Sequence, residues 1–482
     1  MFISTPDWVK DAVFYQIFPD RFARSERVAK PSNLEPWDAP PTKRGFKGGD
    51  LLGIVERFDY LTELGVNALY LNPVFQSTAN HRYHTHDYHR VDPILGGDEA
   101  LRALLAEAHR RGMRVILDGV FNHASRGFYQ FNHILENGPN SPYLDWFHIE
   151  EWPLRPYDIS QPANYGSWWG IRELPKFNTD TPAVREFLWG VARRWIDLGI
   201  DGWRLDVPAD IDDPPFWREF RRRVRAGNPA AYLVGEIWHQ AADWLSGDRF
   251  DALMNYPISR ACLGFMGGDD LDVGERPGGY ELRRLSAEEF ADQVEATLAW
   301  YDWEVVQVQM NVVDSHDMSR FQGLTGGRVE RLKLAVLFQM TFPGAPCIYY
   351  GDEIGLAGRG DPGCREGFPW NADRWDHDLL AFYRRAVGLR HDHRALRRGR
   401  LARVYAGDGV YAYLRHLDGE VLLIALNGAP SARVVDLRLP AEFLAPDAVL
   451  RDLWGGEELP AEAGVLRGVR LGPLSGRVFR RR

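Results

Sequence analysis

Cysteine is scarce in this sequence. Its 482 residues include three, Cys262, Cys347 and Cys364, which are too few and too scattered for a disulfide framework or a structural zinc site. An apolar stretch that approaches the roughly 18 residues of a membrane span is also lacking. The N-terminal segment "MFISTPDWVKDAVFYQIF" has no basic start followed by a long apolar run, as a signal peptide would. These absences predict a reduced, cytoplasmic protein without a membrane segment.

An excess of positive charge is lacking as well. The formal net charge is -9 and the sequence pI is about 5.9, which argues against a general nucleic-acid or anionic-membrane partner. The chain is 45% hydrophobic and 26% charged, an ordinary balance for a globular protein with a large core. Tryptophan and tyrosine are abundant, at 17 and 19 residues, and their flat rings suit contacts with sugars, although most are expected in the core.

Short strand-like runs alternate with longer helical patterns over most of the chain. The runs are β-branched or aromatic and start at residues 12, 66, 114, 201, 231, 250, 308 and 345. Between them, segments such as "DEALRALLAEAHRRG" place apolar residues at helical spacing and end at a glycine, here Gly112. Eight strands with intervening helices predict parallel pairing through right-handed crossovers and closure into a (β/α)8 TIM-like barrel.

Two segments depart from this alternation. Residues 123–175 are rich in Pro, Asn, Gly, Trp and Tyr without clear periodicity. This length exceeds that of an ordinary βα loop, so it predicts an excursion between the third strand and its helix. From about residue 400 the pattern changes to short alternating runs such as "RVYAGDGVYAYLRHL", which predict a small antiparallel β domain.

Polar side chains follow four of the predicted strands, at the rim where a barrel of this type forms its active site. They are Asp118, Asn122 and His123 after the third strand, Arg204 and Asp206 on the fourth, Glu236 on the fifth, and His316 and Asp317 on the seventh. A single carboxylate at a strand end is more often a helix cap or a loop anchor. The convergence of carboxylates, histidines and an arginine on one rim instead indicates chemistry.

Arg204 and Asp206 are two residues apart, so on a strand their side chains point the same way. A buried ion pair stabilises poorly on its own because desolvating both charges roughly cancels their attraction. Either a third group completes a network or the pair serves catalysis. In the catalytic interpretation, Arg204 keeps Asp206 oriented and ionised, because a neighbouring cation lowers the pKa of a carboxylate.

Such a cluster suits cleavage of a glycosidic bond. A retaining mechanism needs one carboxylate as nucleophile and a second, with a raised pKa, to protonate the leaving oxygen. A third carboxylate can stabilise the positively charged transition state, and the histidines can hydrogen-bond sugar hydroxyls. A metal site is the alternative, since His and Asp also bind cations, but an arginine within the cluster would repel a dication.

The motifs "DGVFNH", "GWRLDV", "GEIW" and "VVDSHD" resemble, in order and spacing, the four signature regions of the α-amylase family, glycoside hydrolase family 13. "LPKFN" and "DVPADIDDPPFWREFR" resemble the neopullulanase, cyclomaltodextrinase and maltogenic amylase group within it. The likeness covers nearly the whole chain. It implies a barrel of residues 1–122 and 176–399, an inserted domain B of residues 123–175, and a C-terminal antiparallel β-sandwich of residues 400–482.

Carried over position by position, the resemblance implies that Asp206 is the nucleophile, Glu236 the general acid/base and Asp317 the transition-state stabiliser. It also implies substrate-binding roles for six residues, which are Tyr83, His123, Arg204, Trp238, His316 and Arg320. Tyr83 would stack on the sugar at the cleavage site. Trp238 would line the leaving-group side of the cleft, with simple wall packing as the alternative.

The implied activity is retaining hydrolysis of α-1,4-glucosidic bonds, with some α-1,6 cleavage, in malto-oligosaccharides, cyclodextrins or pullulan. It proceeds through a covalent glucosyl-enzyme, and the expected partner is this α-glucan substrate rather than nucleic acid or membrane. A glucanotransferase or a trehalose-forming isomerase on the same scaffold is the alternative. A non-catalytic glucan-binding protein is a further alternative, against which the complete set of carboxylates argues.

Two departures from the group's pattern modify these expectations. Members carry an N-terminal β domain that dimerises, whereas the first barrel strand here is expected near Ala12, so we expect a monomer with an open cleft. The segment after the first strand often holds calcium, but here it offers Asn33, Asp38 and Asp50 among Pro, Lys and Arg. Calcium prefers six or more oxygen ligands, so we expect that no metal or other cofactor is required, with Asn122 as a candidate for a different calcium position.

Overall fold

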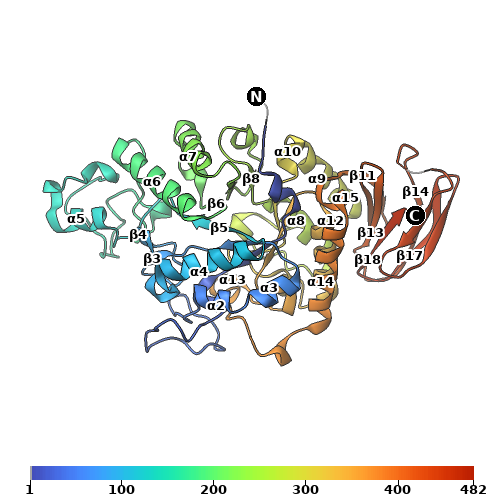
Figure 1. The fold of residues 1–482 in the computed structure, drawn as a ribbon, viewed down its shortest axis with the longest axis horizontal. Coiled ribbons are helices and arrows are strands. Elements are labelled where there is room, and N and C mark those ends of the chain that lie inside the picture. Colours follow the sequence, from blue (N-terminus) through green and yellow to red (C-terminus); the bar gives the residue numbers. More distant parts are fainter. Residues whose placement is uncertain (1–2, 444, 482) are drawn as a thin grey trace.

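The computed structural model describes residues 3–443 and 445–481 of the chain. Its centre is a parallel sheet of eight strands in the order β8-β7-β6-β5-β2-β1-β10-β9 (Figure 1). They are β1 (Phe14–Ile17), β2 (Ala68–Leu71), β5 (Arg114–Gly119), β6 (Gly202–Leu205), β7 (Tyr232–Gly235), β8 (Ala252–Leu253), β9 (Met310–Val312) and β10 (Ala345–Tyr349). A parallel bridge between Met254 and Met310 joins the two edges and closes the barrel. The predicted TIM-like barrel is confirmed, with every predicted strand present.

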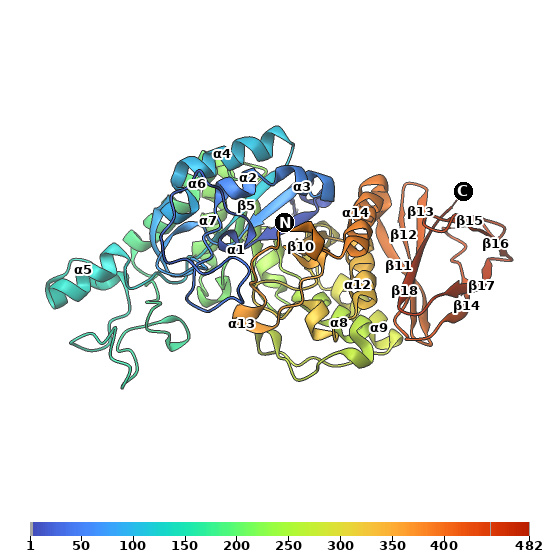
Figure 2. The same ribbon diagram turned by 90° about the horizontal axis from the view of Figure 1, so that it is seen from below.

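Helices surround the barrel (Figures 1 and 2). They are α1 (Pro19–Phe22), α2 (Leu51–Val55), α3 (Phe58–Leu64), α4 (Gly97–Arg110), α6 (Pro182–Leu198), α7 (Pro214–Gly227), α8 (Tyr256–Gly267), α9 (Ala287–Ala299), α10 (Trp303–Val306), α11 (Phe321–Leu324), α12 (Val329–Thr341), α13 (Gly360–Gly363), α14 (His377–Asp392) and α15 (Arg394–Arg398). In α4, Leu101, Leu104 and Ala108 are buried at the spacing that predicted this helix. None of the described helices combines the length and apolar character needed to cross a membrane.

Two excursions leave the barrel on the side where its strands end. The first is a hairpin of β3 (Phe75–Ser77) and β4 (Thr85–Val91) between β2 and α4. The second lies between β5 and α6, contains α5 (Tyr129–Asn137), and projects from one end of the molecule (Figure 2). Phe147 and Phe177 stack within this second excursion, with ring centroids 5.5 Å apart, and they are also joined by a backbone bridge. Aromatic packing therefore stabilises a segment that has little regular secondary structure.

The C-terminal part of the chain forms an antiparallel sheet of eight strands. They are β11 (Arg400–Gly407), β12 (Val410–Leu417), β13 (Glu420–Asn427), β14 (Arg433–Arg438), β15 (Val449–Asp452), β16 (Glu458–Glu462), β17 (Val465–Leu471) and β18 (Ser475–Arg481). The sheet folds on itself around an apolar core that includes Leu414, Leu423, Leu437 and Leu466. Helix α12 contacts β18, and α15 contacts β12, so this unit packs against the barrel (Figure 1). The predicted C-terminal β-sandwich is confirmed.

Candidate active site

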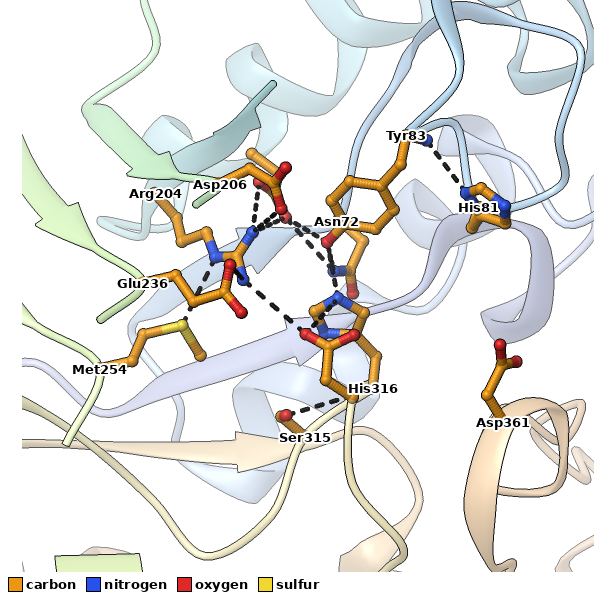
Figure 3. Close-up of polar contacts among 12 residues, drawn as sticks. Asn72, His81, Tyr83, Arg204, Asp206, Glu236, Met254, Ser315, His316 and Asp361 are labelled. Atoms are coloured by element: carbon orange, nitrogen blue, oxygen red, sulfur yellow. Dashed lines mark hydrogen bonds and ion pairs between the residues drawn. The ribbon is translucent and has the colours of Figure 1, made fainter. Parts of the chain in front are cut away.

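Arg204 is the centre of the polar cluster at the barrel rim. Its Nη1–H groups donate to Asp118 Oδ1 and to Asp206 Oδ1, each at 2.9 Å. Its Nη2 lies 3.0 Å from Glu236 Oε2 and 3.8 Å from Asp317 Oδ2. Figure 3 shows the guanidinium between the Asp206 and Glu236 carboxylates. The three predicted catalytic carboxylates therefore face one cation, and Asp118 is the additional group that completes the network.

Strand register brings these residues together. Leu205 ends β6 and pairs with Gly235, which ends β7, so Asp206 and Glu236 follow directly on neighbouring strands. Asp118 pairs with Arg204 across β5 and β6 in the same way. Because parallel strands end at the same side of a barrel, residues distant in sequence share one rim.

Burial dominates the electrostatics of the two central carboxyl groups. It raises the pKa of Asp206 well above its usual range and also raises that of Glu236, while the Arg204 guanidinium opposes the rise at both. Arg204 lowers the pKa of Asp206, as the sequence predicted, but the net shift is upward because burial outweighs this attraction. Arg204 is one cation shared among several buried carboxylates, so its attraction offsets only part of the burial and of the mutual repulsion.

Tyr83 and His316 form a second hydrogen-bonded layer beside the cluster. The Tyr83 hydroxyl donates to Asp118 Oδ2 at 2.7 Å and lies 2.6 Å from His316 Nε2. The Gln16 amide is placed to donate to His316 Nδ1 at 2.8 Å, so we assign the imidazole proton to Nε2. That nitrogen also lies 3.1 Å from Asp317 Oδ2. Burial lowers the pKa of His316 well below its usual range, so the ring is a neutral donor to sugar or protein oxygens.

Trp238 contacts the predicted acid directly. Its indole Nε1–H donates to Glu236 Oε1 at 3.0 Å, and its ring stacks on Tyr256 with centroids 3.5 Å apart. The sequence pattern predicted an aromatic residue beside the leaving group, but it did not predict this hydrogen bond. Tyr83, Arg204, Trp238 and His316 are thus brought together with the carboxylates.

His123 and Arg320 have other surroundings. The buried His123 ring stacks on Trp168 with centroids 5.3 Å apart, and burial lowers its pKa to about 3. Arg320 is fully buried, and its Nη1 donates to Asp352 Oδ1 at 2.6 Å. Its guanidinium also lies over the Tyr349 ring. Arg320 is thus held by protein partners in the structure, and its contact with a sugar stays a prediction.

Arg365 belongs to the site, although it was not among the predicted residues. Its Nη2 lies 3.5 Å from Asp317 Oδ1, and its Nε–H donates to the His316 carbonyl at 2.9 Å. Its Nη1 lies 3.1 Å from Asp361, which is labelled in Figure 3. Asp317 therefore has a cation on each side. The segment "GDPGCREGFPWN" contains Arg365, but spacing alone does not show which strand end it reaches.

The two acidic side chains considered for calcium, Asp38 and Asp50, each pair with a cation. Asp50 caps α2 through its side chain and lies 2.9 Å from the Lys30 ammonium, while Asp38 is paired with Arg374 at 2.5 Å. Asn122 Oδ1 is buried without a hydrogen-bond partner. Across residues 3–443 and 445–481, His, Cys, Asp and Glu side chains form no group of three or more that could hold a metal ion. Calcium prefers six or more oxygen ligands, so the expectation that no metal is required stays a prediction.

Comparison with known proteins assigns the family. A model described as the catalytic domain of alpha amylase matches residues 16–395, well over half of the chain. The chain belongs to the α-amylase family. A second model, the C-terminal domain of maltogenic amylase, matches residues 403–478. The resemblance noted in the sequence, and with it the expectation of an α-glucan hydrolase, is confirmed.

Individual relatives agree along the whole chain. A cyclomaltodextrinase from Geobacillus thermopakistaniensis is 42% identical over 96% of this chain and 76% of its own length. The crystal structure of Ttha1563 from Thermus thermophilus is 49% identical in sequence and superposes with a TM-score of 0.94. The match covers 98% of this α-amylase family chain and 100% of the Ttha1563 chain. The debranching enzyme of Nostoc punctiforme is 45% identical, with a TM-score of 0.90 over 99% of this chain and all of its own.

Proposed function

We propose that this enzyme hydrolyses α-glucosidic bonds in short α-glucans with retention of anomeric configuration. The substrates are malto-oligosaccharides, cyclodextrins or pullulan, and the bonds are α-1,4 with some α-1,6. One observation carries the proposal: a single buried guanidinium, that of Arg204, contacts or approaches Asp206, Glu236 and Asp317. Two carboxylates and a charge stabiliser held around one point are what a retaining glycosidase requires.

In the first step, Asp206 attacks the anomeric carbon of the bound glucosyl unit. Arg204 engages Oδ1 of this carboxylate, which leaves Oδ2 to form the new bond to carbon. The bond from the anomeric carbon to the leaving oxygen breaks, and that oxygen takes the proton of Glu236. The positive charge that develops on the sugar lies beside Asp317, whose carboxylate stabilises it electrostatically.

In the second step, water replaces the departed sugar. Glu236, now ionised, takes a proton from the water as its oxygen bonds to the anomeric carbon, and the bond to Asp206 breaks. Both carboxyl groups return to their starting states, one water is consumed, and two inversions give net retention. Transfer to a sugar hydroxyl instead of water would give the glucanotransferase or isomerase alternative from the same intermediate.

The raised pKa of Glu236 supports its role as the acid. Burial raises this pKa, so the carboxyl retains its proton at a higher pH than an exposed glutamate does. The Asp206 pKa is raised as well, and the two groups face the same guanidinium. We therefore expect the pair to titrate together, in two macroscopic steps whose apparent pKa values belong to the pair.

Preferential cleavage of α-1,6 bonds is a second candidate. The relative named as a debranching enzyme supports it, since that enzyme matches this chain at 45% identity over 99% of its residues. The relative named as a cyclomaltodextrinase supports cleavage of cyclic α-glucans. Location in the cytoplasm and a monomeric state remain predictions, as does independence from metal ions.

Product analysis distinguishes these candidates. We expect maltotriose and cyclodextrin to yield glucose and maltose, with the α-anomer formed first in a proton NMR time course. Pullulan separates the bond types, because cleavage of its α-1,6 bonds releases maltotriose whereas cleavage of its α-1,4 bonds releases panose or isopanose. Trehalose or longer oligomers from maltose, without net glucose, would favour isomerase or transferase activity instead.

The matched variant Glu236→Gln tests the role of the acid. Its activity on maltotriose should fall at least about 100-fold, because general acid catalysis contributes that much. Gln240→Glu, a nearby exchange on the exposed surface, serves as a control and should retain activity. Near-normal hydrolysis by Glu236→Gln would contradict the proposed mechanism.

A further inference from the structure

Each oxygen of the Glu236 carboxyl accepts a hydrogen bond from a neutral N–H group. The indole of Trp238 donates to Oε1 at 3.0 Å, and the backbone N–H of Val207 donates to Oε2 at 3.1 Å. The residue is buried, with 8% of its surface exposed. These donors therefore take the place of water that would solvate an exposed carboxylate.

We propose that Trp238 is a positioning residue, whose indole N–H fixes the orientation of the Glu236 carboxyl and thereby sets the upper pH limit of hydrolysis. The inference rests on the proposed function, in which Glu236 is the general acid. It gives Trp238 a role that differs from contact with the leaving sugar, because the indole acts through a protein carboxyl rather than on the substrate.

The Trp238 ring is held so that its N–H keeps one direction. One face stacks on Tyr256, with centroids 3.5 Å apart and planes 4° from parallel. The Tyr256 hydroxyl donates to Met254 Sδ at 3.7 Å, and Arg204 Nε–H donates to the same sulfur at 3.4 Å. Because Arg204 Nη2 in turn lies 3.0 Å from Glu236 Oε2, the contacts form a ring that ends at the carboxyl group to which the indole donates. The orientation of the indole is thereby linked to that of Arg204, which binds the nucleophile.

Gly278 packs against the same indole. A Cβ atom built on Gly278 would lie 2.4 Å from Trp238 Cε3, so a side chain at this position would collide with the ring. The backbone φ of 58° at Gly278 also favours glycine. The loop can therefore approach the indole closely and restrict its rotation.

Val207 provides the second N–H through an unusual backbone. Its φ of 34° and ψ of 51° are left-handed, which is a conformational outlier for a β-branched residue. Such strain persists only where the surroundings enforce it, and it concentrates at functional sites. Because this donor belongs to the backbone, side-chain substitution leaves it in place. The Trp238 donor is the one that a substitution can remove.

The titratable and charged groups that face Glu236 come from several elements. They are Arg204 in β6, Asp206 after β6, Asp317 after β9 and Tyr256 in α8. Burial raises the pKa of Glu236, and the Asp317 charge adds to the rise. Arg204 opposes it, as do the two N–H donors, because they favour the ionised carboxylate.

The direction of the effect follows from the role of the acid. Hydrolysis requires a protonated Glu236, so kcat/KM falls as the pH rises through the pKa of this group. Removing the Trp238 N–H removes a donor that favours the ionised form, and the pKa rises further. The alkaline limb of the pH profile should therefore move to higher pH in Trp238→Phe, which keeps an aromatic ring against Tyr256.

The test compares pH profiles of kcat/KM on maltotriose for the unmodified enzyme and Trp238→Phe. We expect the alkaline limb to move up by about one pH unit, and kcat at the optimum to fall roughly 10-fold because the carboxyl is less well oriented. Trp189→Phe is the matched control. The Trp189 indole donates to the Phe216 carbonyl at 3.1 Å and stacks on the Phe216 ring, away from the carboxylates, so its profile should stay in place.

An alkaline limb that stays in place in Trp238→Phe, whatever the change in KM, would overturn the inference. Thermal unfolding verifies that the variant is folded, and Trp238→Leu, which also lacks a donor, serves the same test if it is not. The proposed function is tested separately by Glu236→Gln. An inactive Glu236→Gln together with an unmoved limb in Trp238→Phe would refute the positioning role alone.

Discussion

The Asp118 carboxylate and the Arg204 guanidinium meet at 2.9 Å beneath the catalytic rim, although the two residues are 86 positions apart in the sequence. Both side chains are fully buried. Strand register places them side by side on β5 and β6. Asp118 thereby holds Arg204 so that Nη1–H also donates to Asp206 Oδ1 and Nη2 lies 3.0 Å from Glu236 Oε2.

Asp118→Asn should impair both catalysis and stability. Removing one partner of a buried ion pair typically costs about 3 kcal/mol, since it leaves the other charge less compensated. We expect kcat/KM on maltotriose to fall about 100-fold, because a shifted Arg204 misplaces two carboxylates. Urea unfolding and steady-state kinetics measure the two effects.

Asp20→Asn is the control for this variant. Asp20 is equally buried, and it pairs with Arg21 at 2.9 Å and with Arg82 at 3.4 Å. Its loss should lower the free energy of unfolding while leaving kcat/KM on maltotriose unchanged. Unchanged catalysis in Asp118→Asn would show that Arg204 does not depend on Asp118 for its position.

The Asp206 carboxylate should destabilise the folded protein at neutral pH. Its folded pKa is raised above the usual value of 3.8, mainly by burial, so folding favours the protonated form. The protein therefore has its full stability below the pKa that Asp206 has in the unfolded state, and it loses part of this stability as the pH rises through the pKa of Asp206 in the folded state. Asparagine cannot ionise, so Asp206→Asn should not show this loss. We expect this variant to be more stable by at least about 1 kcal/mol at pH 8, with little difference near pH 4.

Denaturant unfolding at both pH values measures this difference. Inactivity of Asp206→Asn is expected in any case, so the readout is the free energy of unfolding alone. Equal or lower stability of the variant at pH 8 would show that Arg204 compensates the buried charge fully.

Chelators should leave the enzyme unaffected. Asp50, the best placed carboxylate in the segment after β1, already lies 2.9 Å from the Lys30 ammonium, which leaves little reason for calcium to bind there. We expect EDTA and added calcium to change neither the melting temperature nor kcat. Lys30→Met, in contrast, should lower the melting temperature, because it leaves the buried Asp50 charge unpaired. A fall in melting temperature on adding EDTA to the unmodified enzyme would reveal a metal site.

The barrel could be predicted because its signals are local. Each strand is a short apolar run, and the intervening helices show a period that differs from that of strands. Even β8, with the residues Ala252–Leu253 alone, lies within a predicted run. The position of the second excursion, between β5 and α6, could be predicted from the sequence. Its structure could not, because it depends on contacts between residues distant in sequence, such as Phe147 and Phe177.

The site was only partly predictable for a related reason. Asp206, Glu236 and Asp317 end strands or follow them, so chain order already indicates a common rim. In the sequence, Arg320 resembled the other predicted site residues. Its buried contact with Asp352 depends on how two loops meet, which the sequence does not show. Arg365 was missed because it lies in the long connection after β10, and only the folding of this connection places it beside Asp317.

The pKa of Asp206 depends on depth of burial, which no spacing of residues reveals. Gln16, which donates to His316, carried a signal that could have been used. A polar side chain within a strand that is otherwise apolar indicates a hydrogen-bonded network in the barrel interior.

In the proposed mechanism, Asp206 forms a covalent bond to the substrate. Glu236→Gln treated with α-maltosyl fluoride tests it directly, because fluoride leaves with little help from an acid whereas hydrolysis of the intermediate still needs a base. We expect an intact-protein mass increased by one maltosyl unit, with the label on the proteolytic peptide that contains Asp206. Turnover of the fluoride without such a label, or a label on another residue, would contradict it.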